Sequence, residues 1–419
     1  MNEDLKYLVK NTKFPYLWTS QILSQIAINM MNFLLLVKLY ERTSSTLAVS
    51  LLWVSYSLPV IIIGPIASAF VDYVDRRSIL IFTNLFQALV IFFYAIFFKE
   101  NVFLVYSIAF FYSLLNQFYL PSESASVSYL VKKELLPHAS GFFYISQQLS
   151  LVFGFASASI LKNFLGFNIS LFICSLLLFM AFVSVLFLPK MKSKIENEMS
   201  LENHIIEFFK SIFSGYEYIR ANKNILFTFL TLIFVQVIFS IVIISVPTIS
   251  ENILKFSANL SGIYIVIPAA LGSLTGAIYI PKFLRNKWRK KNLIEISFIT
   301  MSILLFVETV IVYYIPLYFN IIISAVLIFF LGVFFTGIII PSQTFLQENT
   351  HDTYKGRIFG NMWFITTIAT IIPVIFYGAI TEIIGIRLVL FLISILCLIV
   401  YYFSKNRIFK IINNDQTIK

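Results

Sequence analysis

Charged residues are scarce in this chain of 419 residues: they make up 12% of the sequence, against roughly 25% in soluble domains. Cysteine occurs only twice, at Cys174 and Cys397 inside apolar runs, so no disulfide framework is expected. The three histidines lie in separate polar segments without the spacing of metal ligands, and no phosphate-binding loop of the Walker type occurs. We therefore expect no enzymatic activity, no cofactor, no bound metal and no direct drive by ATP.

Apolar residues dominate the composition. They make up 59% of the chain, with 46 phenylalanines and 22 tyrosines, and the mean hydropathy is +0.88. Runs of roughly 20 apolar residues are long enough to cross a bilayer. Twelve such runs predict a polytopic membrane protein; they cover approximately residues 15–39, 46–71, 78–98, 102–122, 139–162, 166–189, 224–248, 258–281, 292–315, 317–341, 357–381 and 385–404.

The net charge of +11 is explained by membrane topology. Cytoplasmic loops of membrane proteins are enriched in Lys and Arg. With the N-terminus inside, 25 of the 31 Lys and Arg residues lie on the cytoplasmic side. The other six are Lys38, Arg42, Lys99, Lys162, Lys255 and Arg387. We therefore expect both termini in the cytoplasm and no nucleic-acid partner. The abundance of isoleucine, asparagine, lysine and phenylalanine is typical of an AT-rich bacterial genome, so we expect a plasma membrane location in a bacterium.

A polar interruption in the middle of the chain predicts two halves. Residues 190–223 form a cytoplasmic linker between residues 1–189 and 224–419. Apolar residues recur there every three or four positions, as in an amphipathic helix on the membrane surface. A helix that binds a target protein is the alternative.

The two halves share weak sequence echoes. Pro121 and Pro341 each precede a serine near the end of a span, and Gly166 and Gly385 each open one. The members of each pair are separated by nearly the same number of residues. This regular offset between the halves favours an all-α fold of two pseudo-symmetric six-helix bundles, as in secondary transporters built from repeats.

The loop after the second span carries an unusual set of charges. Asp72, Asp75, Arg76 and Arg77 follow a hydrophobic run of about 25 residues. A carboxylate at the end of a membrane helix is costly unless it meets a cation or a helix N-terminus. The loop is either a set of anchoring charges or a conformational latch between two halves of a transporter.

This loop resembles the signature of the major facilitator superfamily, Gly-x-x-x-Asp-Arg-x-Gly-Arg-Arg/Lys. The chain keeps Asp72, Arg76 and Arg77, but has Ser68 and Asp75 in place of the glycines and a tyrosine for the first arginine. The Asp-x-x-Asp-Arg-Arg form is similar to the branch that holds macrolide-efflux proteins and the enterobactin exporter. The stretch Gly356-Arg357-Ile358-Phe359-Gly360 before the eleventh span resembles the same branch.

The resemblance implies a gating role for this loop. In the superfamily, the loop aspartate braces the second span against the start of the eleventh and favours the outward-open state. The implied latch consists of Asp72, Asp75, Arg76, Arg77, Gly356 and Arg357. Drug antiporters of the superfamily also carry Gly-Pro-x-x-Gly-Gly in the fifth span. The matching region, residues 154–158, lacks the proline and the final glycines, so the resemblance to drug antiporters is incomplete.

Amide side chains mark candidate substrate positions. Those of the first span, at offsets 0, 4, 8 and 11, fall within roughly 80° of a helical wheel. Such a stripe faces either a substrate cavity or a neighbouring helix. The candidate cavity residues are Gln21, Gln25, Asn29, Asn32, Asn116, Gln147, Gln236, Ser240 and Asn361.

Two acids are candidates for proton coupling. Glu308 is the acid placed well inside a span, and Glu123 lies just after Pro121 at the end of another. A carboxyl group in hydrocarbon can bind and release a proton during a transport cycle. The alternatives are interface acids, with Glu308 reaching the outer surface and Glu123 lying near Lys132 on the cytoplasmic side.

The resemblance implies a monomeric secondary transporter that works by alternating access, with membrane lipids around it and protons as the coupling ion. Its expected substrate is a small amphipathic drug such as a macrolide, exported by antiport as in multidrug resistance. The alternatives are a dedicated exporter of a siderophore or peptide, a lipid transporter, and a channel or non-transporting receptor.

Overall fold

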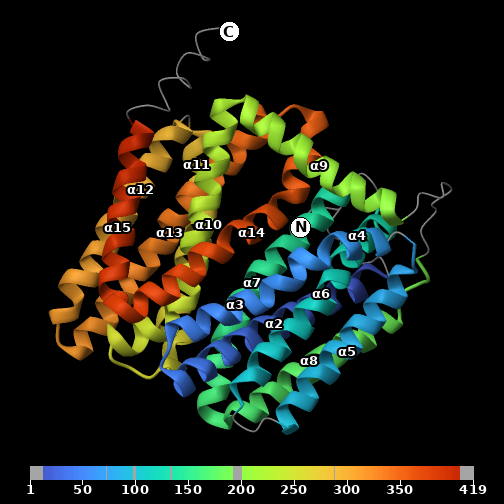
Figure 1. Cartoon of the computed structure of the whole chain (residues 1–419), viewed down its shortest axis with the longest axis horizontal. Helices are drawn as coiled ribbons and strands as arrows, with labels where there is room; N and C mark the ends of the chain where they lie inside the picture. Colours follow the sequence, from blue (N-terminus) through green and yellow to red (C-terminus); the bar gives the residue numbers. More distant parts are fainter. Residues whose placement is uncertain are drawn as a thin grey trace. The chain divides into compact units, whose positions relative to one another are not determined.

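The computed structural model describes residues 13–71, 73–97, 101–132, 135–191, 201–286 and 288–405. All regular elements in these ranges are helices (Figure 1). Eleven of them are long and apolar enough to cross a membrane. The pair α3 (Thr46–Ile62) and α4 (Gly64–Val71), bent by 48° at the break between them, makes a twelfth if it is counted as one span. The predicted all-α membrane protein is therefore confirmed.

Contacts divide the chain into two compact units. The first consists of Met1–Arg42 and Leu51–Phe208, and the second of Thr43–Ser50 and Phe209–Lys419. Besides most of α3 and α4, the first unit contains α2 (Phe14–Thr43), α5 (Arg76–Phe97), α6 (Val102–Leu130), α7 (Leu136–Leu165) and α8 (Phe167–Leu186).

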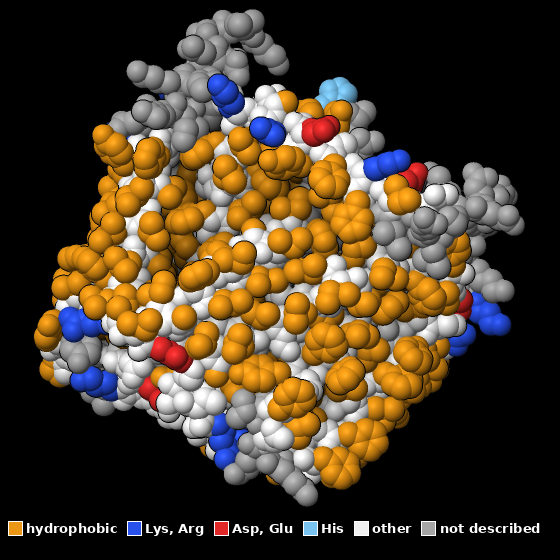
Figure 2. All heavy atoms as spheres, viewed as in Figure 1, with side chains coloured by type: hydrophobic (Ala, Val, Ile, Leu, Met, Phe, Trp, Pro, Cys, Tyr) orange, Lys and Arg blue, Asp and Glu red, His pale blue; other side chains and the backbone are white. Residues whose placement is uncertain are grey.

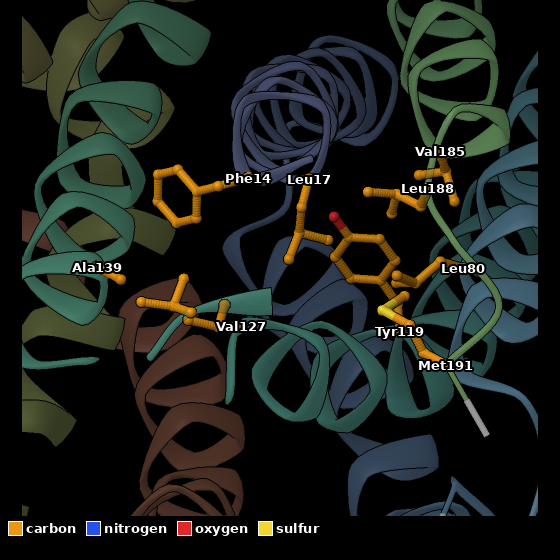
Figure 3. Close-up of a cluster of buried hydrophobic side chains, with 10 residues drawn as sticks. Phe14, Leu17, Leu80, Tyr119, Val127, Ala139, Val185, Leu188 and Met191 are labelled. Carbon is orange, nitrogen blue, oxygen red and sulfur yellow. The ribbon is translucent and has the colours of Figure 1, made fainter. Parts of the chain in front are cut away.

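The core of the first unit lies where five of its helices meet. Figure 3 shows the buried apolar side chains of this cluster; Leu17, Leu80 and Leu188 lie near the ring of Tyr119, and Phe14, Val127 and Ala139 lie on the other side of the view. Tyr119 is only 1% exposed, and Leu17 and Leu80 are fully buried beside it. Burial of such side chains supplies packing energy that fixes the positions of the polar groups on the same helices. The cluster also contains Phe14, Val127, Val131, Ala139, Val185, Leu188 and Met191.

The second unit contains the remaining elements. They are α9 (Leu201–Ala221), α10 (Lys223–Asn252), η2 (Ala258–Leu260), η3 (Gly262–Val266), α11 (Ile267–Arg285), α12 (Lys290–Phe306), η4 (Val307–Ile311), η5 (Val312–Tyr314), α13 (Leu317–Asn349), α14 (Asp352–Ile384) and α15 (Ile386–Phe403). Residues 201–208 of α9 belong to the first unit.

The end of α9 is anchored in the second unit. Ile219 is buried in a cluster with apolar residues of α10, α13 and α14. The ring of Tyr218 stacks on that of Tyr354, with 4.4 Å between centroids, and its hydroxyl accepts a hydrogen bond from the backbone N–H of His351 (3.1 Å). The predicted amphipathic segment therefore forms a helix that docks at the start of α14.

Glycines permit an unusually close crossing of α11 and α13. A Cβ at Gly272 would lie 1.8 Å from the carbonyl oxygen of Phe329, and one at Gly332 would lie 2.1 Å from that of Ala269. Small residues at a helix crossing allow the backbones to approach each other in a membrane, where there is no hydrophobic drive for association. These two helices depend on glycine for their contact.

Two other glycines separate consecutive helices and share one backbone conformation. Gly166, between α7 and α8, and Gly385, between α14 and α15, both have φ of 82°. This left-handed region is costly for other residues. Each glycine N–H donates to a carbonyl four residues earlier, that of Lys162 (3.0 Å) or Thr381 (2.9 Å). The residues paired by their offset in the sequence thus share one local conformation.

The start of α3 is capped from α14. Ser45 is the N-cap, since its hydroxyl accepts from the N–H of Ala48 (3.0 Å). That hydroxyl also donates to the carboxylate of Glu382, which accepts from the N–H of Leu47 as well (3.1 Å). A carboxylate at a helix N-terminus is favoured by the free amides and the helix dipole. Residues 43–50 are thereby bound into the second unit.

Apolar side chains cover most of the face seen in Figure 2, and charged side chains appear toward its margins. Many large apolar side chains are exposed, such as Phe164 (79%) and Ile383 (82%). Exposed apolar surface on this scale suits contact with lipid. The surface therefore agrees with the membrane assignment.

Candidate functional site

The loop between α4 and α5 is fastened to the end of α8. One carboxylate oxygen of Asp75 accepts from the backbone N–H of Met191 (2.6 Å), and the other accepts from the hydroxyl of Ser78 (2.9 Å). The N–H of Arg76 donates to the carbonyl of Met191 (3.4 Å). Asp75 therefore accepts from a hydroxyl in the first turn of α5 and from a backbone amide just beyond α8, both within the first unit.

The two arginines of the loop bind carbonyl oxygens at helix ends. Arg76 donates from Nη1 to the carbonyl of Ala125 in α6 (3.4 Å), and Arg77 from Nη2 to that of Leu186, the last residue of α8 (2.7 Å). The Nζ of Lys13 donates to the carbonyl of the next residue, Phe187 (3.3 Å). Cations at a helix C-terminus are favoured by its free carbonyls and by the helix dipole. The loop thus ties three helices together inside one unit.

The remainder of the predicted latch is not tested by these contacts. Asp72 lies outside the described residues. Gly356 and Arg357 fall within α14, whose backbone is described there while these two side chains are not. The contact between the loop and the eleventh span therefore stays a prediction.

The amides of the first span occupy two different environments on α2. Gln21 is 2% exposed; its Nε2 donates to the carbonyl of Phe143 (3.2 Å) and its Oε1 accepts from the hydroxyl of Ser146 (2.8 Å), both in α7. Gln25 and Asn29 are half-buried, and the Nδ2 of Asn29 donates to the carbonyl of Gln25 (2.7 Å). Asn32 is half-buried as well. The stripe thus begins as an interhelical contact and continues as a partly exposed polar face.

A glycine of α7 packs beside this face. A Cβ at Gly154 would lie 2.5 Å from the Cβ of Asn29 and 3.0 Å from the carbonyl oxygen of Ile26. The absence of a side chain at Gly154 therefore allows α7 to pack closely against α2. Asn29 of α2 therefore packs directly against the backbone of α7 at Gly154.

The other amide candidates are dispersed. Asn116 is 8% exposed in α6 and Gln147 is exposed on α7. In α10, Gln236 is half-buried, and the buried hydroxyl of Ser240 donates to its carbonyl (3.1 Å). Asn361 lies in α14 at a position whose side chain is not described.

Glu308 is buried in an irregular stretch of the second unit. It lies in η4, a π-helical turn that continues α12, and is 4% exposed. Among the described residues, neither of its carboxyl oxygens has a hydrogen-bond partner. Ser324 of α13 faces it, but that hydroxyl donates to Asn320 (3.4 Å). Short π-helical turns are frequent at functional sites.

Glu123 lies in a buried polar network that the residue patterns did not reveal. Its Oε1 accepts from the hydroxyl of Tyr119, one turn earlier on α6 (2.8 Å). Beside Tyr119, the hydroxyl of Ser24 donates to Oδ1 of Asn84 (3.0 Å), whose Nδ2 donates to the hydroxyl of Ser20 (3.2 Å). The four-residue spacing of the serines and of Tyr119 and Glu123 indicates a shared face on each helix. Which helices would meet was not visible in the sequence.

No group of histidine, cysteine, aspartate and glutamate suited to a metal ion occurs in the described part of the chain. The buried polar groups described above instead form hydrogen bonds between helices that are long and apolar enough to cross a membrane.

Comparison with known proteins identifies this arrangement. The family profile of the Major Facilitator Superfamily matches residues 17–374. The chain belongs to this superfamily. It is therefore an integral membrane transporter and not an enzyme, as the sequence predicts.

Relatives and solved structures agree with this assignment. Macrolide efflux protein A of Streptococcus pyogenes is 24% identical over 393 residues, which cover 91% of this chain and 92% of that protein. The uncharacterized MFS-type transporter YkuC of Bacillus subtilis (strain 168) is 27% identical over 162 residues, 38% of this chain and 37% of that protein. The nucleoside transporter NupG has a TM-score of 0.71 at 13% identity, covering 93% of this chain and 98% of its own. A bacterial homologue of the iron transporter ferroportin has a TM-score of 0.69 at 14% identity, covering 94% and 98%. At these identities the two structures show a shared fold alone.

Proposed function

We propose that this transporter exports amphipathic molecules of the macrolide class from a bacterial cell by alternating access, in exchange for protons. The observation that carries the proposal is the similarity to macrolide efflux protein A along almost the whole of both chains. The Asp-x-x-Asp-Arg-Arg loop supports it, because the same form marks the branch that the sequence resembles.

The half-buried polar faces supply groups for the substrate in this proposal. Gln25, Asn29 and Asn32 of α2 and Gln236 of α10 present amides that can donate to and accept from the hydroxyl and ether oxygens of a macrolide. Abundant aromatic residues suit the apolar part of an amphipathic molecule. Gln21 is already bonded to α7, so its contribution is to position α2.

The proposed orientation places both termini in the cytoplasm and the protein, as a monomer, in the plasma membrane. The excess of Lys and Arg in alternate loops supports it. In this orientation the loop containing Asp75 and the linker helix α9 face the cytoplasm, and the α3 cap formed by Ser45 and Glu382 lies on the outer side.

The test is drug accumulation in bacteria that express the protein. A labelled macrolide and, separately, a lipophilic dye are supplied with and without a protonophore that collapses the proton gradient. We expect lower macrolide accumulation in expressing cells than in cells without the protein, and we expect the difference to disappear with the protonophore, because an exporter that exchanges macrolide for protons draws its driving force from the proton gradient. Cells without the protein set the baseline, and the variant Leu176→Ala, at an exposed apolar position of α8, controls for expression level.

The opposite result is equally informative. Unchanged accumulation of both compounds, with the protein confirmed in the membrane, contradicts drug export. It favours the alternative, a dedicated exporter of an endogenous metabolite such as a siderophore or peptide, or a lipid transporter. The incomplete fifth-span motif at residues 154–158 is the observation that keeps this alternative in view.

A further inference from the structure

The first unit buries a carboxyl group with an assigned hydrogen-bond donor. Glu123 is 7% exposed, near the end of α6. The hydroxyl of Tyr119 donates to its Oε1 at 2.8 Å, and Tyr119 is itself 1% exposed in the apolar cluster of Figure 3. A buried carboxyl group in a membrane span is expensive and is usually retained for function. Its geometry is fixed here by the packing around the tyrosine ring.

The bond to Tyr119 continues into a chain of hydroxyls. The Tyr119 hydroxyl faces Ser20 and Ser24 of α2, and these two serines are joined by the side-chain amide of Asn84 in α5. Ser20 and Asn84 are fully buried, so hydrogen bonds within the protein are what satisfies their polar atoms. The network connects α6, α2 and α5.

Among the ion pairs of the described residues, none includes Glu123. On the neighbouring helix α5, Arg76 directs its guanidinium to the backbone carbonyl of Ala125, two residues after Glu123 (3.4 Å). The titratable groups that face Glu123 are Tyr119 and Tyr112, both on α6. A carboxylate that is paired with hydroxyls alone can take up a proton without breaking a salt bridge.

We propose that Glu123 is the proton-binding site of the transport cycle and that Tyr119 is its positioning residue. This inference rests on the proposed function and names the group that couples it to protons. In the ionised form both carboxylate oxygens can only accept hydrogen bonds, and Oε1 accepts one from Tyr119. Uptake of one proton turns an acceptor oxygen into an O–H donor, so the donors and acceptors around it must rearrange. The hydroxyl of Tyr119 can then rotate to donate toward Ser20 or Ser24, whose own bonds to the amide of Asn84 can keep their directions.

The network gives protonation a route to the substrate face. Ser24 precedes Gln25 on α2 and lies one turn before Ile28 and Asn29. A change in the bonding of Ser20 and Ser24 therefore acts on the helix that presents the half-buried amides. Glu308 shows no comparable network: among the described residues its carboxyl oxygens lack a hydrogen bond of good geometry, and Ser324 of α13 is the side chain that faces it.

The experiment measures protonation directly, so that it does not depend on the substrate. The purified full chain in lipid vesicles is titrated by infrared difference spectroscopy, which detects the C=O stretch of a buried protonated carboxyl group. We expect the titrating band of the wild type to be absent in Glu123→Gln and present in Glu308→Gln and in Glu348→Gln, an exposed carboxyl on α13 that serves as the control. Tyr119→Phe keeps the band and shifts the pH midpoint of its titration, which loss of packing alone would not do.

Transport of a labelled macrolide provides the second arm. In Glu123→Gln we expect export against a gradient to fall about tenfold or more, while exchange of labelled for unlabelled macrolide across the vesicle membrane continues. A band that persists in Glu123→Gln, or one that disappears in Glu308→Gln instead, overturns the assignment. If the wild type shows the Glu123 band but exports no macrolide, the proton site stands and the substrate class of the proposed function is wrong.

Discussion

Asp75 shows how one carboxylate can organise a membrane loop. Its two oxygens accept from the N–H of Met191 and the hydroxyl of Ser78, groups that lie next to the ends of α8 and α5. We expect Asp75→Ala to leave both donors without this acceptor and to destabilise the protein by about 1–2 kcal/mol. Asp75→Asn keeps one acceptor oxygen and should cost less. Thermal unfolding of purified protein in detergent measures both, and an alanine variant as stable as the wild type contradicts the clamp.

For these charged residues, the sequence indicated their importance but did not indicate their contacts. The position of Asp75, Arg76 and Arg77 after a long apolar run already indicated paired charges at the end of a span. Apart from the hydroxyl of Ser78, which donates to Asp75, the partners described above are backbone groups more than 40 residues away in the chain, such as the carbonyls of Ala125 and Leu186. Backbone acceptors leave no trace in residue identity, so these contacts could not be inferred. The expectation of side-chain ion pairs stays untested, because Asp72 and the side chain of Arg357 are not described.

Helix crossings at glycine define the element scale. At Gly272 and Gly332 an added Cβ would meet backbone atoms of the facing helix, which cannot turn aside as a flexible side chain can. We expect Gly272→Ala and Gly332→Ala to separate α11 from α13, to cost about 1–3 kcal/mol as overpacking does, and to lower the unfolding temperature. Gly141→Ala in α7 is the matched control, since a Cβ there would meet nothing within 4 Å. The crossing is not essential if the three variants unfold at the same temperature.

The helices themselves were largely predictable and their irregularities were not. Apolar runs of sufficient length gave the positions of the spans, because backbone groups in a bilayer must be satisfied within each helix. The break at Ile63 comes directly before Gly64 and Pro65, residues that favour an interruption of a helix. Hydropathy registers neither this pair nor the π-helical turn around Glu308. Gly272 and Gly276 are four residues apart, the spacing of small residues at membrane helix crossings. The close crossing of α11 was therefore indicated by its own sequence.

For the molecule as a whole, the polar linker marks where the chain passes from one unit to the other. Contacts place the boundary within α9, after Phe208, and they also assign Thr43–Ser50 to the second unit. That short segment joins the second unit through Thr46, which bonds to Thr248 (3.0 Å), and through the cap from Glu382. Its partners lie more than 200 residues further along the chain, and local sequence carries no information on such pairing.

Alternating access makes a prediction for the whole transport cycle. In the proposal, the amide faces of α2 and α10 line the substrate pathway, so water should reach them from only one side of the membrane at a time. Single cysteines at Asn29 and Gln236 can be read against a silent background, because the two native cysteines are buried. We expect a membrane-impermeant thiol reagent added outside to label each position at a rate that changes at least about fivefold when a macrolide is present, the lower end of typical coupling between sites. Leu176→Cys, at an exposed apolar position of α8, should stay unlabelled under both conditions because lipid excludes the reagent.

Equal labelling from both sides, unaffected by macrolide, would instead indicate a continuous pore. No labelling at either position from either side would remove these amides from the pathway and leave the transport mechanism to other faces of the same helices.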